Sequence, residues 1–306
     1  MTEPTMAEDI RVSRDIVYGS GRIQVGSTPR ERALKLDIYE PAVERGDRSR
    51  PALIMAFGGA FHRGDKWADE FEQDGQRNTP VSDYCRMFAR RGYVAFSIDY
   101  RLVQEDPDPG STPVIADPHD IPMSRVAHVR SLLGLPAADA PMIWAGIEAA
   151  TDDMAKAFGF VQSKAQNLGI DPERIVVGGF SAGARIALNA CYGERLAAAA
   201  VVSLSGYMGN AELLRLVVGG QGLPPALLVH GENDLDYIAA QVGPMRQHFE
   251  ATKVGCEAWQ VTGASHFYPA DSVAVRHDGK VSTVEAAVVA FVDRSTRRDR
   301  APHDGL

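Results

Sequence analysis

The sequence is poor in cysteine, with three residues in 306. Three cysteines are too few for a disulfide framework, and no two of them have the spacing of metal ligands. We therefore expect no structural disulfide and no bound metal, and the reducing cytoplasm is the simplest location. Free cysteine usually packs as a small apolar side chain, so Cys85, Cys191 and Cys256 are predicted to be buried.

The sequence also has no excess of positive charge. It contains 32 Lys and Arg against 40 Asp and Glu, which gives a formal net charge of -8. Such a chain lacks the basic surface that binds a phosphate backbone, so nucleic acid is not expected as a partner. No apolar run approaches the about 20 residues of a membrane-spanning helix. The first residues, MTEPTMAEDI, lack the basic start and apolar core of a signal peptide. We predict a cytoplasmic protein without a membrane partner, while the oligomeric state stays open.

Short apolar runs alternate with longer helical patterns along most of the chain. The runs are nearly continuous in aliphatic residues, which is typical of strands buried on both faces. Strands separated by helices of this length predict an α/β fold, with a mostly parallel central sheet flanked by helices, in one domain over residues 1–306. The predicted strands are residues 33–39, 51–57, 93–98, 174–180, 198–204, 225–230 and 257–261, and the predicted helices are residues 81–91, 144–167, 182–192, 238–252 and 283–294.

Residues 103–141 interrupt this alternation. The segment contains PDPGSTP, ADPHDIP and LGLPAADAP, which are dense in proline and glycine. A stretch of this length without regular elements is uncommon in a compact domain, and it usually forms a lid, a binding loop or a linker. We predict that residues 103–141 form a lid inserted over the functional site.

The most specific motif is Gly179-Phe180-Ser181-Ala182-Gly183, which stands between the strand-like IVVGGF and the helix-like ARIALNACYG. A sharp turn from strand to helix holds the serine in a strained conformation, and small neighbours leave room for the turn. The hydroxyl then stands at a helix N-terminus, where the dipole favours a developing negative charge. We predict that Ser181 is a nucleophile rather than an ordinary helix cap.

A serine hydroxyl needs a general base, and the base needs an acid that orients it. The base is predicted to be His266, in the loop GASHFYP directly after a predicted strand. The other seven histidines precede the acid or lie in helical or polar stretches. Asp234 is the preferred acid because its position after Gly231 lets the carboxylate turn back toward His266. Glu232 and Asp236 follow the same strand and stay as alternatives, although Asp236 is also suited to cap the next helix.

Acyl transfer also needs hydrogen-bond donors where negative charge develops on the carbonyl oxygen. One donor is predicted to be the backbone N–H of Ala182, the residue after the nucleophile. The second is expected from the loop after an early strand, where the chain reads GGAFHRGD from residue 58. Small residues let the backbone approach the substrate, so the N–H groups of Gly59 and Ala60 are the candidates.

These motifs together resemble the α/β-hydrolase superfamily. The resemblance rests on GFSAG, the FGGAF–x–x–GD loop, DYRL at residues 99–102, LGIDPERIVVGG, HGENDLD and GASHFYP, and it covers most of residues 33–292. Within the superfamily the chain is similar to the carboxylesterase branch with an HGGG-type oxyanion loop, including the acetyl- and feruloyl-esterase-like enzymes.

The resemblance implies a triad of Ser181, Asp234 and His266, and a sheet of eight mostly parallel strands. It also implies that Asp99, Tyr100 and Arg101 have a core role. The chain departs from this branch at two positions of the oxyanion loop. Phe57 stands where the branch has histidine, and Ala60 stands where the branch has its third glycine. Both residues keep the backbone groups that such a loop uses.

The sequence therefore predicts a serine hydrolase that cleaves a small-molecule carboxylic ester through an acyl-enzyme, with no metal or organic cofactor. Phe61, Phe180 and Phe267, with Tyr268 nearby, are predicted to form an apolar substrate pocket, although core packing explains these aromatic residues nearly as well. The same triad serves amidases, peptidases and lactone hydrolases, so these activities stay open. A non-catalytic binding protein on this fold would be expected to lack a triad residue, and none is missing here.

Overall fold

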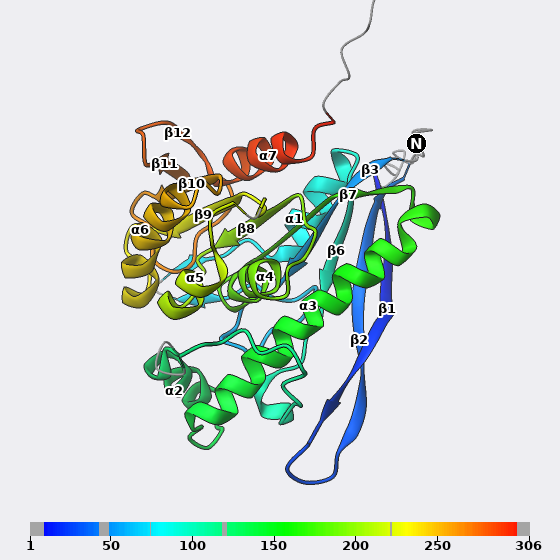
Figure 1. Cartoon of the computed structure of the whole chain (residues 1–306), viewed down its shortest axis with the longest axis vertical. Coiled ribbons are helices and arrows are strands. Elements are labelled where there is room, and N and C mark those ends of the chain that lie inside the picture. The colour runs from blue at the N-terminus through cyan, green and yellow to red at the C-terminus, as the bar shows by residue number, and fades with distance from the viewer. Residues whose placement is uncertain (1–8, 43–48, 74, 118–120, 221, 299–306) are drawn as a thin grey trace, which may run out of the picture.

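The fold is organised around one large sheet, whose strands in spatial order are β1-β2-β6-β3-β7-β8-β9-β10-β11-β12. The computed structural model describes residues 9–42, 49–73, 75–117, 121–220 and 222–298. From β6 to β10 all neighbouring strands in this order run parallel (Figure 1). Parallel strands need crossover connections, and helices supply them here. The predicted α/β fold with a mostly parallel sheet is confirmed.

The central strands coincide with the most apolar runs of the sequence. All five residues of β6 and of β8 are buried, and so are the last six residues of β7. Because both faces of these strands are covered, their sequences do not alternate between apolar and polar residues. The parallel strands are β3 (Arg50–Ala56), β6 (Val94–Ile98), β7 (Ile170–Phe180), β8 (Ala200–Leu204), β9 (Ala226–Gly231) and β10 (Cys256–Val261).

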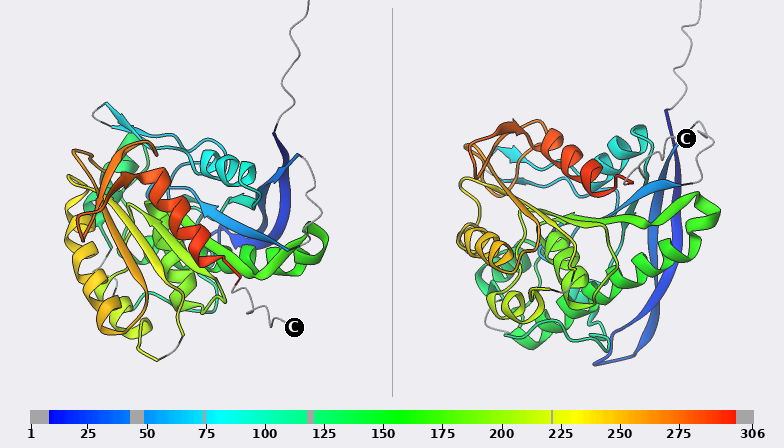
Figure 2. Two further views of the ribbon diagram at one scale, coloured as in Figure 1. Left: turned by 90° about the horizontal axis from the view of Figure 1, so that it is seen from above. Right: turned by 45° about the horizontal axis from the view of Figure 1, so that its top comes forward.

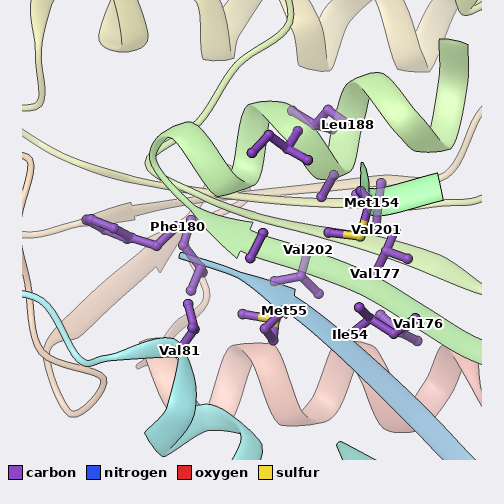
Figure 3. Packing of buried hydrophobic residues seen from close by; sticks show 14 of the residues in the cluster. Ile54, Met55, Val81, Met154, Val176, Val177, Phe180, Leu188, Val201 and Val202 are labelled. Carbon is purple, nitrogen blue, oxygen red and sulfur yellow. The ribbon is translucent and has the colours of Figure 1, made fainter. Parts of the chain in front are cut away.

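Helices cover both faces of the sheet. On one face lie α1 (Val81–Arg90) and α7 (Val284–Ser295), and on the other lie α3 (Ala140–Leu168), α4 (Ala182–Gly193) and α6 (Asp236–Ala251) (Figure 2). Figure 3 shows Leu188 of α4 and Val81 of α1 on opposite sides of the central strands. The apolar side chains between these layers form one continuous core.

The two edges of the sheet are antiparallel. At one edge β1 (Ile10–Ile23) pairs with β2 (Arg30–Pro41), and at the other β11 (Val273–Arg276) pairs with β10 and with β12 (Val281–Thr283). The expectation of eight strands is therefore wrong, since this sheet has ten in the described part of the chain. Strand β1 was not predicted because most of its side chains are exposed or half-buried, so its sequence shows no apolar run.

The segment of residues 103–141 is more regular than predicted. It contains a short 3-10 helix, η1 (Val103–Glu105), and the helix α2 (Met123–Leu132). Helix α3 begins at residue 140 rather than 144, because the Asp139 carboxylate accepts the Met142 N–H at 2.9 Å and Pro141 fits the first turn. Five more elements were not predicted, namely the edge strands β11 and β12, the helix α5 (Asn210–Leu216) and the short strands β4 (Glu72–Gln73) and β5 (Gln76–Arg77). Part of the predicted lid, residues 118–120, lies outside the described residues.

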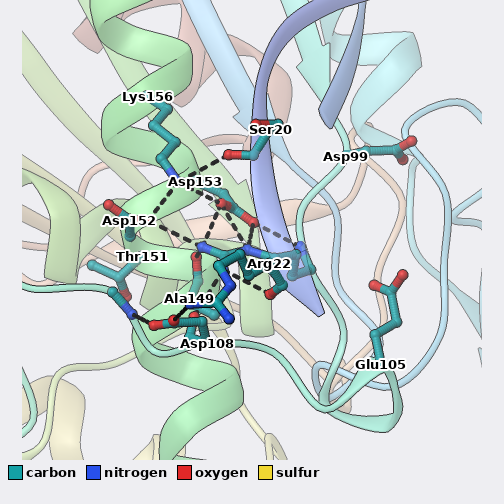
Figure 4. A network of polar contacts seen from close by, with 12 residues as sticks. Ser20, Arg22, Asp99, Glu105, Asp108, Ala149, Thr151, Asp152, Asp153 and Lys156 are labelled. Atoms are coloured by element: carbon teal, nitrogen blue, oxygen red, sulfur yellow. Dashed lines mark hydrogen bonds and ion pairs between the residues drawn. The ribbon is translucent and has the colours of Figure 1, made fainter. Parts of the chain in front are cut away.

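A buried ion-pair network joins the edge hairpin to α3 (Figure 4). The Arg101 guanidinium contacts the carboxylates of Asp153 at 2.8 Å and Asp152 at 3.0 Å. It also donates to the backbone carbonyl of Arg22 in β1 at 3.3 Å. A buried guanidinium needs such a full set of acceptors. The core role expected for Arg101 agrees with these contacts.

Two expectations from composition can be compared with the structure. All three cysteines are free; Cys85 and Cys191 are buried, whereas Cys256, the first residue of β10, is only partly buried. In the described part of the chain, no helix combines the length and the apolar character that crossing a membrane requires.

Candidate active site

The predicted nucleophile lies on a strained turn between β7 and α4. Ser181 has φ 54° and ψ -114°, a conformation that a non-glycine residue adopts only when its surroundings impose it. A Cβ atom at Gly183 would lie 2.0 Å from the Ala56 carbonyl oxygen, and one at Gly179 would lie 2.4 Å from the Gly183 carbonyl carbon. Only glycine fits at both positions, which explains the spacing of the motif.

His266 lies beside the serine hydroxyl. Its Nε2 atom is 2.8 Å from Ser181 Oγ, a hydrogen-bond distance that joins residues 85 positions apart in the sequence. The loop that carries His266 follows β10 and is held at Ser265, whose N–H donates to the Gln76 side chain at 2.7 Å. The imidazole packs against the rings of Phe180 and Phe267, with centroid distances of 5.5 and 4.9 Å. The base candidate is thus fixed in direction by packing as well as by hydrogen bonds.

Asp234 lies on the other side of the imidazole. Its Oδ1 atom is 2.6 Å from His266 Nδ1, and its side chain is buried. The two alternative acids lie elsewhere: Glu232 accepts the Gly263 N–H at 2.7 Å, and Asp236 is the first residue of α6. The structure therefore brings Ser181, His266 and Asp234 together in one hydrogen-bonded row.

The Asp234 carboxylate is surrounded by donors. Besides His266, it accepts hydrogen bonds from the Ser205 hydroxyl at 2.7 Å, the Gly231 N–H at 3.0 Å and the Leu235 N–H at 2.8 Å. Burial raises the pKa of Asp234, but the hydrogen bonds from these groups, with that of His266 foremost, outweigh it and hold the pKa below its ordinary value. The carboxylate is thus ionised at neutral pH and can stabilise an imidazolium.

Ser205 was not singled out in the sequence. It follows β8 directly and has a left-handed backbone, with φ 49°. Its Oγ atom also lies 3.0 Å from the hydroxyl of Tyr268, which in turn donates to the Val229 carbonyl at 3.3 Å. Serine follows strands too often for its position in the sequence to indicate a function. The left-handed backbone of Ser205, which only the structure shows, does point to a functional role.

The loop after β3 lies close to the serine. A Cβ atom at Gly58 would lie 3.3 Å from Ser181 Cβ, so this backbone passes close to the nucleophile. Gly59 and Ala60 both have positive φ angles, 107° and 54°. A side chain at Gly59 is excluded because its Cβ would lie 2.0 Å from the Arg63 carbonyl oxygen. Ala182 is the first residue of α4, so its N–H has no acceptor within the helix.

Tyr100 holds the start of the loop after β3 in place. Its hydroxyl lies within hydrogen-bond distance of the carbonyl oxygens of Phe57 and Gly58, at 3.0 and 3.2 Å, and its ring stacks on Phe57 with a centroid distance of 4.3 Å. The aromatic residue at position 57, where the resembled branch has histidine, thus packs against the DYRL segment. The three predicted oxyanion-hole residues, Gly59, Ala60 and Ala182, border the same pocket as Ser181.

The serine and the imidazole open into a pocket with mainly apolar walls. Phe61 and Phe267 line it, as predicted, but Phe180 is not among its described lining residues. Phe180 is buried and packs beneath His266 and Phe267, so it supports the site without facing the pocket. We therefore correct its expected role from substrate contact to packing. Tyr268 is likewise buried.

Helix α2 forms one wall of this pocket, which the sequence did not reveal. Ile121 and Pro122, just before the helix, and Arg125, Val126 and Val129 within it line the cavity. Other parts of the lining come from α3, from the segment after β8 and from the start of α6, through Ile143, Ile147, Tyr207, Tyr237 and Ile238. The 103–141 segment thus contributes directly to the space in which a substrate would lie.

Comparisons with known proteins concern the class of enzyme and the fold of this chain. The sequence model of the phospholipase/carboxylesterase family matches residues 140–275, a range that contains Ser181, Asp234 and His266. No curated protein matches the sequence. The family match supports the predicted class of enzyme, an esterase-like serine hydrolase.

Solved structures with a similar fold include esterase 2 of the planctomycete Thermogutta terrifontis. Its form phosphorylated by paraoxon has a TM-score of 0.57 at 19% identity, over 96% of this chain and 95% of the other. The butyrate-bound form also has a TM-score of 0.57, at 20% identity, over 98% of this chain and 99% of the other. At this identity the likeness shows the fold, and the expected α/β-hydrolase architecture is thereby confirmed.

Proposed function

We propose that this chain is a serine hydrolase that cleaves carboxylic esters through an acyl-enzyme intermediate. The observation that carries the proposal is the hydrogen-bonded row of Ser181, His266 and Asp234 at the floor of an apolar pocket. A hydroxyl on a strained turn, an imidazole within 2.8 Å and an ionised carboxylate behind it are the parts that nucleophilic acyl transfer requires.

The reaction begins when Ser181 Oγ attacks the ester carbonyl carbon and His266 Nε2 accepts its proton. Asp234 holds the imidazole in the orientation that leaves Nε2 free to act, and it stabilises the imidazolium that forms. The carbonyl oxygen becomes negatively charged and is stabilised by the N–H groups of Ala182 and of Gly59 or Ala60. Each such donor contributes about 3–4 kcal/mol to the transition state.

The tetrahedral intermediate then collapses and releases the alcohol. His266 donates its proton to the leaving oxygen, the C–O bond of the ester breaks, and the acyl group stays on Ser181. Water then attacks the acyl carbon while His266 takes its proton. The bond between that carbon and Ser181 Oγ breaks, His266 returns the proton to Oγ, and the carboxylic acid leaves. Every step uses side chains and backbone groups of the protein, so the proposed reaction needs no metal or organic cofactor.

Several finer features belong to the same proposal. The loop of residues 57–65 serves as the oxyanion loop of a carboxylesterase of the acetyl- or feruloyl-esterase-like branch, with alanine as its third small residue. The segment 103–141 acts as a lid, which its helix α2 supports by lining the pocket. The partner is a small-molecule ester, encountered in the cytoplasm, and neither nucleic acid nor a membrane takes part.

A covalent inhibitor and a nucleophile variant test this function together. We expect the wild-type protein to hydrolyse 4-nitrophenyl acetate and to gain one diethylphosphoryl group from paraoxon, located at Ser181 by peptide mass spectrometry. The Ser181→Ala variant should lose turnover and remain unlabelled. Full turnover by this variant, or labelling at another residue, would contradict the proposal. A folded wild-type protein that neither turns over nor reacts would favour the non-catalytic alternative.

Ester cleavage is favoured over amide cleavage by the mainly apolar lining of the pocket, which offers few acceptors for an amide N–H. A matched set of one ester, one amide and one lactone with the same acyl chain distinguishes them. We expect kcat/KM to be highest for the ester. A higher value for the amide or the lactone would assign the triad to amidase or lactonase activity.

A further inference from the structure

Arginine side chains border the candidate active-site pocket without acidic neighbours. Arg63, Arg125 and Arg185 line it, and none of its described lining residues is aspartate or glutamate. This is unusual for a chain with 40 acidic and 32 basic residues. The buried Arg101, by contrast, is matched by the carboxylates of Asp152 and Asp153.

The described partners of Arg63 and Arg125 are uncharged. The Arg63 guanidinium stacks over the Phe71 ring at 4.7 Å, and its buried Nε atom has no hydrogen-bond acceptor in the described residues. Arg125 donates to the neutral Gln73 side chain at 3.2 Å. Within the described ranges, no carboxylate forms an ion pair with either arginine. Both therefore bring net positive charge to the pocket.

These two guanidinium groups also act on each other. Burial lowers the pKa of Arg63, and the positive charge of Arg125 lowers it further. Two like charges beside an apolar cavity repel, and an anion placed between them would remove that repulsion. Arg185 differs, because its Nη1 donates to the Tyr207 hydroxyl at 2.6 Å and its guanidinium stacks on the same ring at 4.7 Å. We assign Arg185 to the pocket wall and not to the anion site.

We propose that the preferred substrates are esters carrying a second, anionic group such as a carboxylate, which Arg63 and Arg125 bind while Ser181 attacks the ester carbonyl. The two arginines come from different elements, the loop after β3 and helix α2, so the anion would bridge the oxyanion loop to the predicted lid. Guanidinium is suited to this role because its planar donors match a carboxylate. The inference rests on the proposed esterase function.

Matched pairs of esters test this preference. Monomethyl adipate and methyl hexanoate have the same acyl length and differ in a terminal carboxylate, and 6-acetoxyhexanoate and hexyl acetate differ likewise on the alcohol side. For one of these pairs we expect kcat/KM to be higher for the anionic ester by about tenfold or more. The pair that shows the preference tells whether the anion belongs to the acyl or to the alcohol part. Added salt should reduce the preference.

Variants assign the effect to the two arginines. Arg63→Met and Arg125→Met should each reduce the ratio of kcat/KM between the anionic and the neutral ester, and the double variant should reduce it to about one. Arg125→Lys should keep part of the preference. Arg246→Met is the matched control, because Arg246 pairs with Glu250 on α6 and does not line the pocket.

The outcomes separate this inference from the function on which it rests. Equal kcat/KM values for both members of each pair would overturn the anion site while leaving the esterase function intact. A preference that survives in the double variant would also overturn it. If the wild type hydrolyses no ester, the esterase function fails. The anion site is then tested through binding of monomethyl adipate to the Ser181→Ala variant by calorimetry, which should weaken when both arginines are replaced.

Discussion

The Ser205 hydroxyl donates a hydrogen bond of 2.7 Å to Asp234 Oδ2, the carboxylate oxygen that does not face His266. The same oxygen accepts the Gly231 N–H, while Oδ1 accepts the Leu235 N–H in addition to contacting the imidazole. Both oxygens of the carboxylate are therefore fixed from two directions. In the proposed mechanism, this fixes the orientation of the imidazole as well.

Replacing Ser205 with alanine should weaken catalysis more than binding. The variant loses a hydrogen bond to a charged group, so we expect kcat for a neutral ester to fall about tenfold and the free energy of unfolding to fall by about 1.5–3 kcal/mol. KM should change little, because the hydroxyl acts through Asp234. Steady-state kinetics and urea unfolding measure both effects. Since Ser205 has a positive φ angle, Ser205→Gly serves as the control without backbone strain. A rise in KM at unchanged kcat would contradict this role.

The glycines of the turn give a second prediction. A Cβ atom at Gly183 would overlap the Ala56 carbonyl oxygen at 2.0 Å, and the backbone of both residues is packed and cannot move aside easily. Gly183→Ala should therefore lower the free energy of unfolding by about 2–3 kcal/mol and reduce activity by more than tenfold. Gly243→Ala in α6 is a matched control, because a Cβ atom there meets nothing within 4 Å. Thermal denaturation and ester hydrolysis test the pair, and equal stability of the two variants would contradict the clash.

The sequence predicted most of the proposed catalytic site because its chemistry is encoded locally. Ser181 stands in a turn that tolerates only glycine at fixed spacing, and Asp234 and His266 directly follow strands whose carboxyl ends meet at one sheet edge. Ser205 follows a strand in the same way, but its role depends on a long-range contact with Asp234 that no local pattern records.

The pocket and the sheet edges were harder to predict. Helix α2 is polar on much of its surface and is bordered by proline, so the sequence resembles a loop, although Val126 and Val129 pack into the pocket. Strand β1 is exposed over much of its length and is defined by its pairing with β2. Phe180 was predicted to line the pocket because it precedes the nucleophile. It is the last residue of a strand, where side chains point alternately to the two faces, and its ring packs against His266 instead.

The buried carboxyl group of Asp69 gives a prediction about pH. Burial raises the pKa of Asp69 to about 7. The Val81 N–H, which lies 3.1 and 3.2 Å from the two carboxylate oxygens, lowers this pKa but does not offset the effect of burial. The unfolded chain releases this proton near the ordinary value of 3.8. Between these two pH values the folded state binds more protons than the unfolded state. The contribution of Asp69 to the free energy of unfolding therefore falls as pH rises from about 4 to about 7, and it is constant above.

Asp69→Asn should remove this dependence. We expect the free energy of unfolding of the variant, relative to wild type, to rise by roughly 2–4 kcal/mol between pH 4 and pH 8. Urea unfolding at several pH values measures the difference. Asp83→Asn, an exposed carboxylate in the first turn of α1, controls for the change in net charge. A constant difference between wild type and Asp69→Asn across this range would show that Asp69 ionises normally in the folded protein.

His62 links the oxyanion loop to helix α2. Its Nδ1 atom lies 2.6 Å from the Ala60 carbonyl oxygen, and its Nε2 atom lies 3.0 Å from Arg130 Nη1. A guanidinium only donates, so Nε2 accepts and Nδ1 carries the proton that is donated to Ala60. Burial lowers the pKa of His62, and the charge of Arg130 lowers it further while the hydrogen bond to Ala60 opposes this. The imidazole is therefore neutral and holds α2 against the loop.

Breaking this link should loosen the pocket wall. In Arg130→Met we expect faster amide hydrogen exchange in α2 and a KM for neutral esters that rises about threefold to tenfold, because Val126 and Val129 are no longer held in place. His62→Leu should have the same effect. In a double-mutant cycle on the free energy of unfolding, the two changes should be coupled by about 1 kcal/mol, since each removes the same hydrogen bond. Additive effects, with exchange in α2 unchanged, would mean that the two side chains do not depend on each other and that other contacts hold this wall of the pocket.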